Sequence, residues 1–192
     1  MRFTGERVVP KDMDDSVIHV LQEHLARYNF ALAYCVDKKV LDAACGVGYG
    51  SWLLAQVARE VTGYEKDRET VSYARAHYGA NSRQVDLNSI YPIHQQYWDV
   101  VVSFETIEHL LRYKVFVDFA QSACQTFIFS LPFRSASPFH VDNSDEHFHE
   151  MVAYIQSQFS RLEWFYQQGM NLYNQADPAW AYYYLVGVAH AH

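Results

Sequence analysis

The sequence predicts an α/β fold built on a doubly wound, mostly parallel sheet. Short apolar runs that are typical of strands alternate with helical patterns along the chain as far as Leu131. The first apolar run ends in Asp42 and a glycine-rich turn, and the next residues, 51–58, have the apolar spacing of a helix. Repeated strand–helix units join parallel strands by right-handed crossovers, so we expect a parallel sheet covered on both faces.

The first elements can be assigned in chain order. Asp14, Asp15 and Ser16 are candidate caps for a helix ending near Cys35, because apolar residues recur at helical spacing from Val17 onward. Gly79 should end the third helix, since glycine readily takes the left-handed conformation after a helix. The expected ranges up to this point are strand 38–42, a helix ending near 59, strand 60–65 and a helix beginning at 67.

The later elements follow the same alternation and then change. The nearly all-apolar run 98–103 suits a central strand, and Pro132 closes a fifth strand. The C-terminal strands should form an antiparallel hairpin around Gly169 and Pro178, which gives seven strands in one domain, 1–192, with an N-terminal cap segment, 1–37. The expected ranges are strand 83–87, a polar connection 88–97, strand 98–103, a helix opening at 105–109 and continuing or restarting through 115–124, strand 126–131, helix 148–159, and strands 161–167 and 180–189.

Composition excludes several classes of protein. Half of the 192 residues are hydrophobic, which argues against disorder, and the formal charge of −7 argues against a nucleic-acid partner. From Ser135 onward Arg161 is the only Lys or Arg. No apolar run reaches the roughly 18–20 residues of a membrane span. Three widely spaced cysteines favour buried free thiols and a reducing, cytoplasmic location.

The glycine-rich turn is the first candidate binding element. Gly46 and Gly48 allow positive φ and a close approach of the backbone to a ligand, and the helix that follows offers unpaired N–H groups. Roughly 20 residues further on, Glu65 ends the second strand, where α/β nucleotide folds hydrogen-bond a ribose. A single Gly-x-Gly is common in turns that enter helices, so Glu65 strengthens the functional interpretation.

The order Asp-x-x-x-Gly-x-Gly from Asp42 to Gly48 resembles motif I of the class I S-adenosylmethionine (SAM)-dependent methyltransferases, which have a Rossmann-like fold. The resemblance extends from Thr4 to about Val141 and is greatest to the small methyltransferases of bacterial surface-glycan clusters. After Phe119 the usual glycine-glycine turn is absent. The segments that carry the resemblance are Thr4–Pro10, Glu23–Tyr28, Val40–Gly50, Gly63–Glu65, Val85–Leu87 and Val102–Leu110.

The resemblance also implies a set of cofactor-binding residues. Asp42 would anchor the loop and the methionine amino group, and Glu65 would bind both ribose hydroxyls. Asp86 would bind the adenine amino group, and Phe104 would lie near the adenine or the sulfonium. Arg7, Arg27 and Tyr28 are candidates for the methionine carboxylate, or alternatively form a capping salt-bridge set. The remaining cofactor-binding candidates are Ala44, Cys45, Gly46, Gly48, Lys66 and Leu87.

Methyl transfer to a hydroxyl requires in-line alignment and a base. The spacing of Glu105, Glu108 and His109 predicts that all three lie on one face of a helix, where they could hold a divalent ion. This pattern resembles the metal-assisted O-methyltransferases that use Mg²⁺, and His140 is then the expected fourth ligand, with His147 second. In the alternative, no metal is used, the glutamate of the Glu-His pair caps the helix, and His109 faces the substrate as the base.

These residues predict a SAM-dependent O-methyltransferase acting on a hydroxyl of a small molecule or a glycan. Two alternatives stay open from the sequence: a metal-assisted RNA 2′-O-methyltransferase, and a catalytically silent SAM-binding partner subunit. The tail after His140 is compact, so we expect a small substrate lid or one completed by a second subunit, as in a homodimer.

Overall fold

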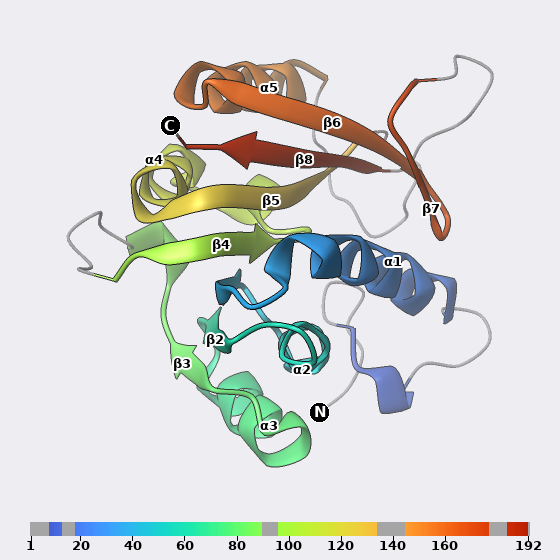
Figure 1. Ribbon diagram of the computed structural model, residues 1–192, viewed down its shortest axis with the longest axis vertical. Coiled ribbons are helices and arrows are strands. Elements are labelled where there is room, and N and C mark those ends of the chain that lie inside the picture. Colours follow the sequence, from blue (N-terminus) through green and yellow to red (C-terminus); the bar gives the residue numbers. More distant parts are fainter. Residues whose placement is uncertain (1–7, 13–17, 90–95, 134–144, 177–183, 192) are drawn as a thin grey trace.

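A computed structural model describes residues 8–12, 18–89, 96–133, 145–176 and 184–191. Its centre is an eight-stranded sheet with the order β3-β2-β1-β4-β5-β8-β6-β7 (Figure 1). The strands are β1 Lys39–Ala43, β2 Glu60–Glu65, β3 Ser82–Gln84, β4 Trp98–Ser103, β5 Cys124–Pro132, β6 Arg161–Gln168, β7 Asn171–Tyr173 and β8 Tyr184–His190. The helices are α1 Ile18–Cys35, α2 Tyr49–Leu54, α3 Arg68–Tyr78, α4 Tyr113–Ala123 and α5 Asp145–Gln158, with short 3-10 helices η1 Pro10–Asp12, η2 Leu87–Ser89 and η3 Ile107–His109.

The sheet confirms the predicted Rossmann-like fold. Strands β1 to β5 pair in parallel, whereas β8 is antiparallel to both β5 and β6. The first strand, β1, lies in the middle of the parallel part; from it the chain runs outward to β3 and then returns to β4 on the other side of β1. The strand order therefore reverses between β1 and β4, which in open α/β sheets is the place where ligands bind.

One strand more is present than the sequence predicted. Gln168 pairs with Asn171, so Gly169 and Met170 form a two-residue turn that leads into β7. Gly169 has a φ of +57°, the left-handed conformation that such tight hairpin turns require. The strand has only three residues, too few for its side-chain alternation to be recognised in the sequence.

Hydrogen bonds explain where several elements end. The Asp67 side chain accepts from the Glu69 N–H at the start of α3, and Gly79 ends this helix with φ +61°, as predicted. Helix α2 ends at Leu54, before the expected 59, because residues 55–58 continue as turns bonded to Ser51, Leu53 and Leu54. The expected strand 83–87 stops at Gln84, and η2 begins at Leu87.

The expected helix opening at 105–109 was wrong. Only Ile107–His109 is helical, and its hydrogen bonding is that of a 3-10 turn. Glu105 before it has φ +49° and Thr106 has φ −135°, neither of which is right-handed helical backbone. Helix α4 starts separately at Tyr113. Residues 105–109 are therefore a tight turn at the end of β4, and a regular i, i+3, i+4 face does not form there.

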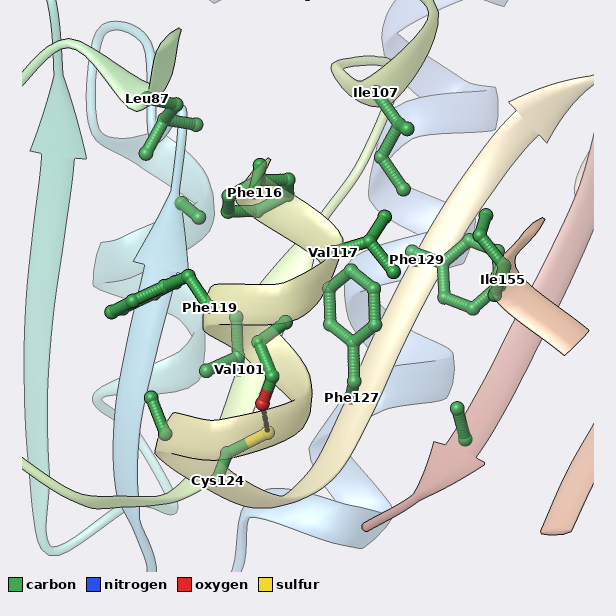
Figure 2. Packing of buried hydrophobic residues seen from close by; sticks show 14 of the residues in the cluster. Leu87, Val101, Ile107, Phe116, Val117, Phe119, Cys124, Phe127, Phe129 and Ile155 are labelled. Carbon is green, nitrogen blue, oxygen red and sulfur yellow. Dashed lines mark hydrogen bonds between the residues drawn. The ribbon is translucent and has the colours of Figure 1, made fainter. Parts of the chain in front are cut away.

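Two hydrophobic clusters hold helices against the two faces of the sheet. One joins α4 and α5 to β5 through aromatic and aliphatic side chains, among them Phe116, Phe127 and Ile155 (Figure 2). The other joins α1 and α2 to β1 and β4 through residues such as Tyr28 and Leu54. The three cysteines are buried and free, as predicted, so none of them forms a disulfide.

No helix within the described ranges is long and apolar enough to cross a membrane. Several predictions lie outside the described residues: the caps at 14–16, the part of the polar connection around Pro92, and the loop around Pro178. The organisation of the whole chain as one domain stays a prediction.

Candidate functional site

A cavity of about 230 Å³ opens at the carboxyl ends of β1 to β4. Each of these parallel strands is followed by residues that line it: 44–47, 65–66, 85–88 and 104–106. Helix α1 and the start of α2 supply the wall beside the glycine-rich turn. The cavity thus lies at the reversal of strand order. The other lining residues are Val8, His24, Tyr28, Tyr49, Tyr64, His109 and Leu110.

The glycine-rich turn is held close to its neighbours. Its start is bonded to β2 by the Cys45 N–H, which donates to the Tyr64 carbonyl at 2.9 Å. Gly48 has φ +94°, and a Cβ added there would lie 2.7 Å from the Cβ of Ala74 on α3. Gly46 has φ +53° but open space around a Cβ position, and it lines the cavity. Gly48 is therefore required for close packing on α3, and Gly46 brings backbone to the ligand space.

Asp42 ties together the elements below this turn. Its two carboxylate oxygens accept hydrogen bonds from the Ser51 hydroxyl at 2.6 Å and the Tyr28 hydroxyl at 3.1 Å. The side chain is fully buried, and burial raises the pKa of Asp42 to about 6, while the two hydroxyls counteract this rise. Asp42 does not itself line the cavity. Asp42 is therefore placed to anchor the loop, and its side chain does not reach a ligand in the cavity directly.

The acids after β2 and β3 both reach the cavity, together with their predicted companions Lys66 and Leu87. Glu65 Oε1 accepts from the Asp67 N–H at 2.9 Å, which fixes the carboxylate at the end of β2. Asp86 Oδ1 accepts from the Asn88 N–H at 2.9 Å. Each carboxylate is thus oriented by the turn that follows its strand.

Three aromatic rings meet in the cavity wall. Tyr28 packs edge-on against Tyr49, with 5.9 Å between ring centroids, and against Phe104, with 5.1 Å. Burial is the main cause that raises the pKa of both tyrosines, so their hydroxyls keep their protons at neutral pH. Aromatic faces attract a nearby cation, and three of them make this part of the cavity suitable for one.

Arg27 and Tyr28 on α1 were predicted together as cofactor-binding residues, but their side chains lie in different surroundings. Tyr28 lines the cavity, but Arg27 does not. The Arg27 guanidinium is fully buried, donates from Nη1 to Gln167 Oε1 at 2.8 Å, and lies 4.3 Å from the centroid of the Tyr184 ring. Arg27 therefore joins α1 to the C-terminal strands. Arg7 lies outside the described residues.

His24 lines the cavity and was missed as a site residue by the sequence reasoning. Its Nδ1 lies 3.0 Å from the Tyr49 hydroxyl oxygen. His24 and Tyr28 are four residues apart on α1, so they share one face of this helix. That spacing was a signal in the sequence that could have placed His24 beside Tyr28.

The turn after β4 does not place Glu105, Glu108 and His109 on one helical face, although His109 Nε2 lies 3.9 Å from Glu108 Oε1. Glu105 lines the cavity; its N–H donates to Ser130 Oγ at 2.9 Å, and the Ser130 hydroxyl donates to Glu105 Oε1 at 2.6 Å. His109 also lines the cavity, with 42% of its side chain exposed. The Glu108 side chain is 1% exposed and faces inward, away from the cavity lining. Its burial, with the Glu105 carboxylate nearby, raises the pKa of Glu108 well above its usual range.

The donor set does not fit the predicted Mg²⁺ site. Over the described parts of the chain, no group of three or more His, Cys, Asp or Glu side chains could hold a metal ion. Mg²⁺ needs converging oxygen ligands in near-ideal octahedral geometry, whereas Glu105 is hydrogen-bonded to Ser130 and the Glu108 side chain is buried outside the cavity lining. His147 lies on α5 against Tyr113, outside the cavity lining, and His140 lies outside the described residues.

Comparison with known proteins agrees with this geometry. Residues 41–126 match the family model described as a methyltransferase domain. A probable S-adenosylmethionine-dependent methyltransferase of Mycolicibacterium smegmatis is 37% identical over 116 residues, which cover 60% of this chain and 44% of that protein. A ubiquinone biosynthesis O-methyltransferase of Yersinia enterocolitica is 35% identical over 79 residues, 38% of this chain and 33% of that protein. The matched part thus spans less than half the length of these relatives.

Solved structures share the fold at low sequence identity. The N-methyltransferase NodS of Bradyrhizobium japonicum has a TM-score of 0.67 at 13% identity, covering 94% of this chain and all of that one. Magnesium protoporphyrin IX methyltransferase of Synechocystis, with bound S-adenosylhomocysteine (SAH), has a TM-score of 0.63 at 14% identity. The superposition covers 92% of this chain and 88% of that one. Residues 41–126 therefore resemble a methyltransferase domain, and the chain shares the Rossmann-like α/β fold of these solved methyltransferase structures.

Proposed function

We propose that this chain is a SAM-dependent methyltransferase that methylates a hydroxyl of a small molecule or a glycan. The observation that carries the proposal is the cavity at the reversal of strand order, where each of the first four strands ends in residues suited to one part of SAM. The activity of the full protein is part of this proposal, as are the roles of the individual residues.

The lining residues support SAM as the ligand. Glu65 lies at the end of β2, where a carboxylate can accept hydrogen bonds from both ribose hydroxyls. Asp86 and Leu87 follow β3 and can bind the edge and the face of the adenine. The rings of Tyr28, Tyr49 and Phe104 offer aromatic faces to a sulfonium. Residues 44–47 supply the backbone of the turn along the remaining, methionine part.

The reaction needs few groups from the protein. SAM, when bound, supplies an electrophilic methyl carbon attached to a sulfonium. The protein aligns the acceptor oxygen with the carbon–sulfur bond. His109 would take the hydroxyl proton on an imidazole nitrogen as the acceptor oxygen bonds to the methyl carbon, and the sulfur would keep the electron pair of the broken bond as a neutral thioether. The exposed part of the His109 ring can afterwards pass the proton to water.

Glu105 and Ser130 act on the position of this base. The positive φ of Glu105 is a strained conformation, and the two hydrogen bonds with Ser130 hold it in place. His109 follows within the same turn, so its ring direction depends on this pair. We assign Glu105 and Ser130 as positioning residues.

The choice of a hydroxyl acceptor rests on His109. An alcohol must lose its proton to become an effective nucleophile, so a base beside the acceptor is useful. The fold alone does not choose the acceptor atom, since one structural neighbour is an N-methyltransferase and one sequence relative is an O-methyltransferase. No observation on the described residues favours the RNA substrate or the silent subunit.

The test separates binding from transfer. We expect calorimetry to show binding of S-adenosylhomocysteine (SAH), the product of methyl transfer, and loss of that binding in Glu65→Gln. Glu69→Gln is the matched control, because Glu69 is an exposed acid on α3 outside the cavity. Transfer of labelled methyl groups from SAM to a panel of polyols, phenols and amines should be confined to hydroxyls and should fail in His109→Gln, with SAH affinity unchanged. Absence of SAH binding in the unsubstituted protein would refute the proposal.

A further inference from the structure

We propose that Asn88 joins the adenine end of the cavity to the turn that carries His109, so that the position of this base depends on bound cofactor. This role rests on the proposed function. Asn88 lines the cavity from η2, is half-buried, and was not singled out by the sequence reasoning. It is a positioning residue, because it acts through Asp86 at one end and through the chain after His109 at the other.

Asn88 holds the carboxylate that follows β3. Its backbone N–H donates to Asp86 Oδ1 at 2.9 Å, and its side-chain Nδ2 donates to the same oxygen at 3.2 Å. Both donations fall on Oδ1, so Oδ2 is the oxygen left for the edge of the adenine. Hydrogen bonds to a carboxylate are stronger than those between neutral groups, and two of them orient it. The direction in which Asp86 meets a ligand thus depends on Asn88.

The other end of the same amide holds the chain after His109. Asn88 Oδ1 accepts from the Arg112 N–H at 3.1 Å, across 24 positions of the sequence. Arg112 directly precedes α4, and only two residues separate it from His109. Helix α4 contacts both η2 and η3, so the two short helices are neighbours on it. Asn88 therefore anchors the segment that leads from His109 into α4.

Only one orientation of the Asn88 amide satisfies both neighbours. Its carbonyl oxygen faces a backbone donor, and its NH2 group faces a carboxylate. The reversed amide would place its oxygen against the Asp86 carboxylate and its NH2 group against the Arg112 N–H, and both contacts would be repulsive. An asparagine thus serves both ends at once, whereas an aspartate would serve one end and an alanine neither.

The turn of His109 is consequently anchored at both ends. Ser130 fixes its start through Glu105, and Asn88 fixes its end through Arg112. Between these anchors lies η3. When the adenine orders the acid after β3, it orders Asn88 as well, and the second anchor of the turn tightens. Cofactor binding therefore sets the position of the base before transfer takes place.

Amide hydrogen exchange followed by NMR measures this link without an acceptor. We expect saturating SAH to slow exchange of the Arg112 amide by roughly two- to tenfold, the range that one net hydrogen bond supplies. In Asn88→Ala this amide should exchange roughly two- to tenfold faster without ligand, because its acceptor is lost. Saturating SAH should then leave that rate unchanged.

Asn88→Asp separates the two ends of the link. The new carboxylate still accepts from the Arg112 N–H but places an oxygen against Asp86, so exchange at Arg112 should stay slow while the Kd of SAH rises by at least about fivefold. Asn88→Ala should raise this Kd less, because it removes a donor without adding repulsion. The rate of methyl transfer at saturating SAM should follow the opposite order, with a fall of at least about fivefold in Asn88→Ala and less than about twofold in Asn88→Asp. A loss of stability alone would not produce these crossed orders.

Asn81 supplies the matched control. Its Nδ2 donates to Thr62 Oγ1 at 3.3 Å from the connection between α3 and β3, outside the cavity lining. Asn81→Ala and Asn81→Asp should leave the SAH affinity, the Arg112 exchange rate and the transfer rate unchanged. Circular dichroism and the thermal midpoint establish that each variant is folded.

Three results would each overturn the link. They are equal exchange of the Arg112 amide in Asn88→Ala and the unsubstituted protein, SAH binding that leaves this exchange unchanged in the unsubstituted protein, and an undiminished transfer rate in a folded Asn88→Ala protein. If the unsubstituted protein does not bind SAH at all, the proposed function itself fails, and the exchange rates without ligand still report whether Asn88 holds Arg112.

Discussion

Gly48→Ala tests whether the glycine-rich turn owes its position to close packing on α3. Two independent costs are expected at this residue. Its φ of +94° lies in the left-handed region, which costs an L-residue about 1–2 kcal/mol. The new Cβ would lie 2.7 Å from Ala74 Cβ, 3.2 Å from Ala74 Cα and 3.3 Å from Ala80 Cβ. None of these atoms is the far end of a flexible side chain, so α3 must move.

Overpacking of this kind costs about 1–3 kcal/mol, and with the backbone term of about 1–2 kcal/mol the free energy of unfolding should fall by about 2–5 kcal/mol. Urea unfolding followed by circular dichroism measures this change. SAH affinity should fall as well, because the shift displaces the turn that lines the cavity.

Gly79→Ala is the matched control, since Gly79 has a similar left-handed φ of +61° with nothing within 4 Å of a Cβ position. It should lose only the backbone term of about 1–2 kcal/mol and keep its SAH affinity. Equal destabilisation of the two variants would refute the packing argument.

Three further substitutions test the buried polar groups. The pKa of Asp42 is raised from 3.8 to about 6 in the folded protein, so this carboxyl stabilises the fold at low pH and loses that contribution as the pH rises from about 4 to 6. At 1.36 kcal/mol per pKa unit, the free energy of unfolding should fall by about 3 kcal/mol over this range. The urea midpoint of Asp42→Asn should lack this fall, and parallel pH profiles for the two proteins would contradict the prediction. Arg27→Leu should lower the free energy of unfolding by about 2–3 kcal/mol, because the hydrogen bond to Gln167 is lost, while SAH affinity stays within about twofold. Arg161→Leu, at an exposed position, is the control. Loss of SAH binding in a folded Arg27→Leu protein would show that Arg27 contributes to the ligand site. Ser130→Ala should lower the free energy of unfolding by about 1–3 kcal/mol and slow methyl transfer, with SAH binding unchanged. Ser122→Ala, on the exposed face of α4, should change neither quantity. A normal transfer rate in Ser130→Ala would show that the Glu105 turn does not position His109.

Local chemistry was enough to predict most of the fold. The strand 60–65, the strand 98–103, the helix start near 67 and the helix end at Gly79 were all recognised from neighbouring residues, because apolar runs and helix-ending residues act over a few positions along the chain. The acids at strand ends were found for the same reason. Parallel strands bring their carboxyl ends to one edge of the sheet, so Glu65 and Asp86 had to lie near the glycine-rich turn.

The tertiary structure decided which side chains face the cavity. The turn at Glu105 depends on hydrogen bonds from Ser130, a residue 25 positions away on β5, and no local spacing reveals that bond. It removes the helical face on which the metal prediction depended and turns His109 toward the cavity while Glu108 is buried.

The directions of His24 and Arg27 on α1 were likewise set by distant partners. Gln167 on β6 and Tyr184 on β8 hold the Arg27 guanidinium, and Tyr49 holds the His24 ring. The sequence alone thus predicted a ligand site and the edge of the sheet at which the cavity lies. Its polar contacts were decided only by the packing of segments far apart in the chain, because a side chain's direction depends on the partners that burial brings to it.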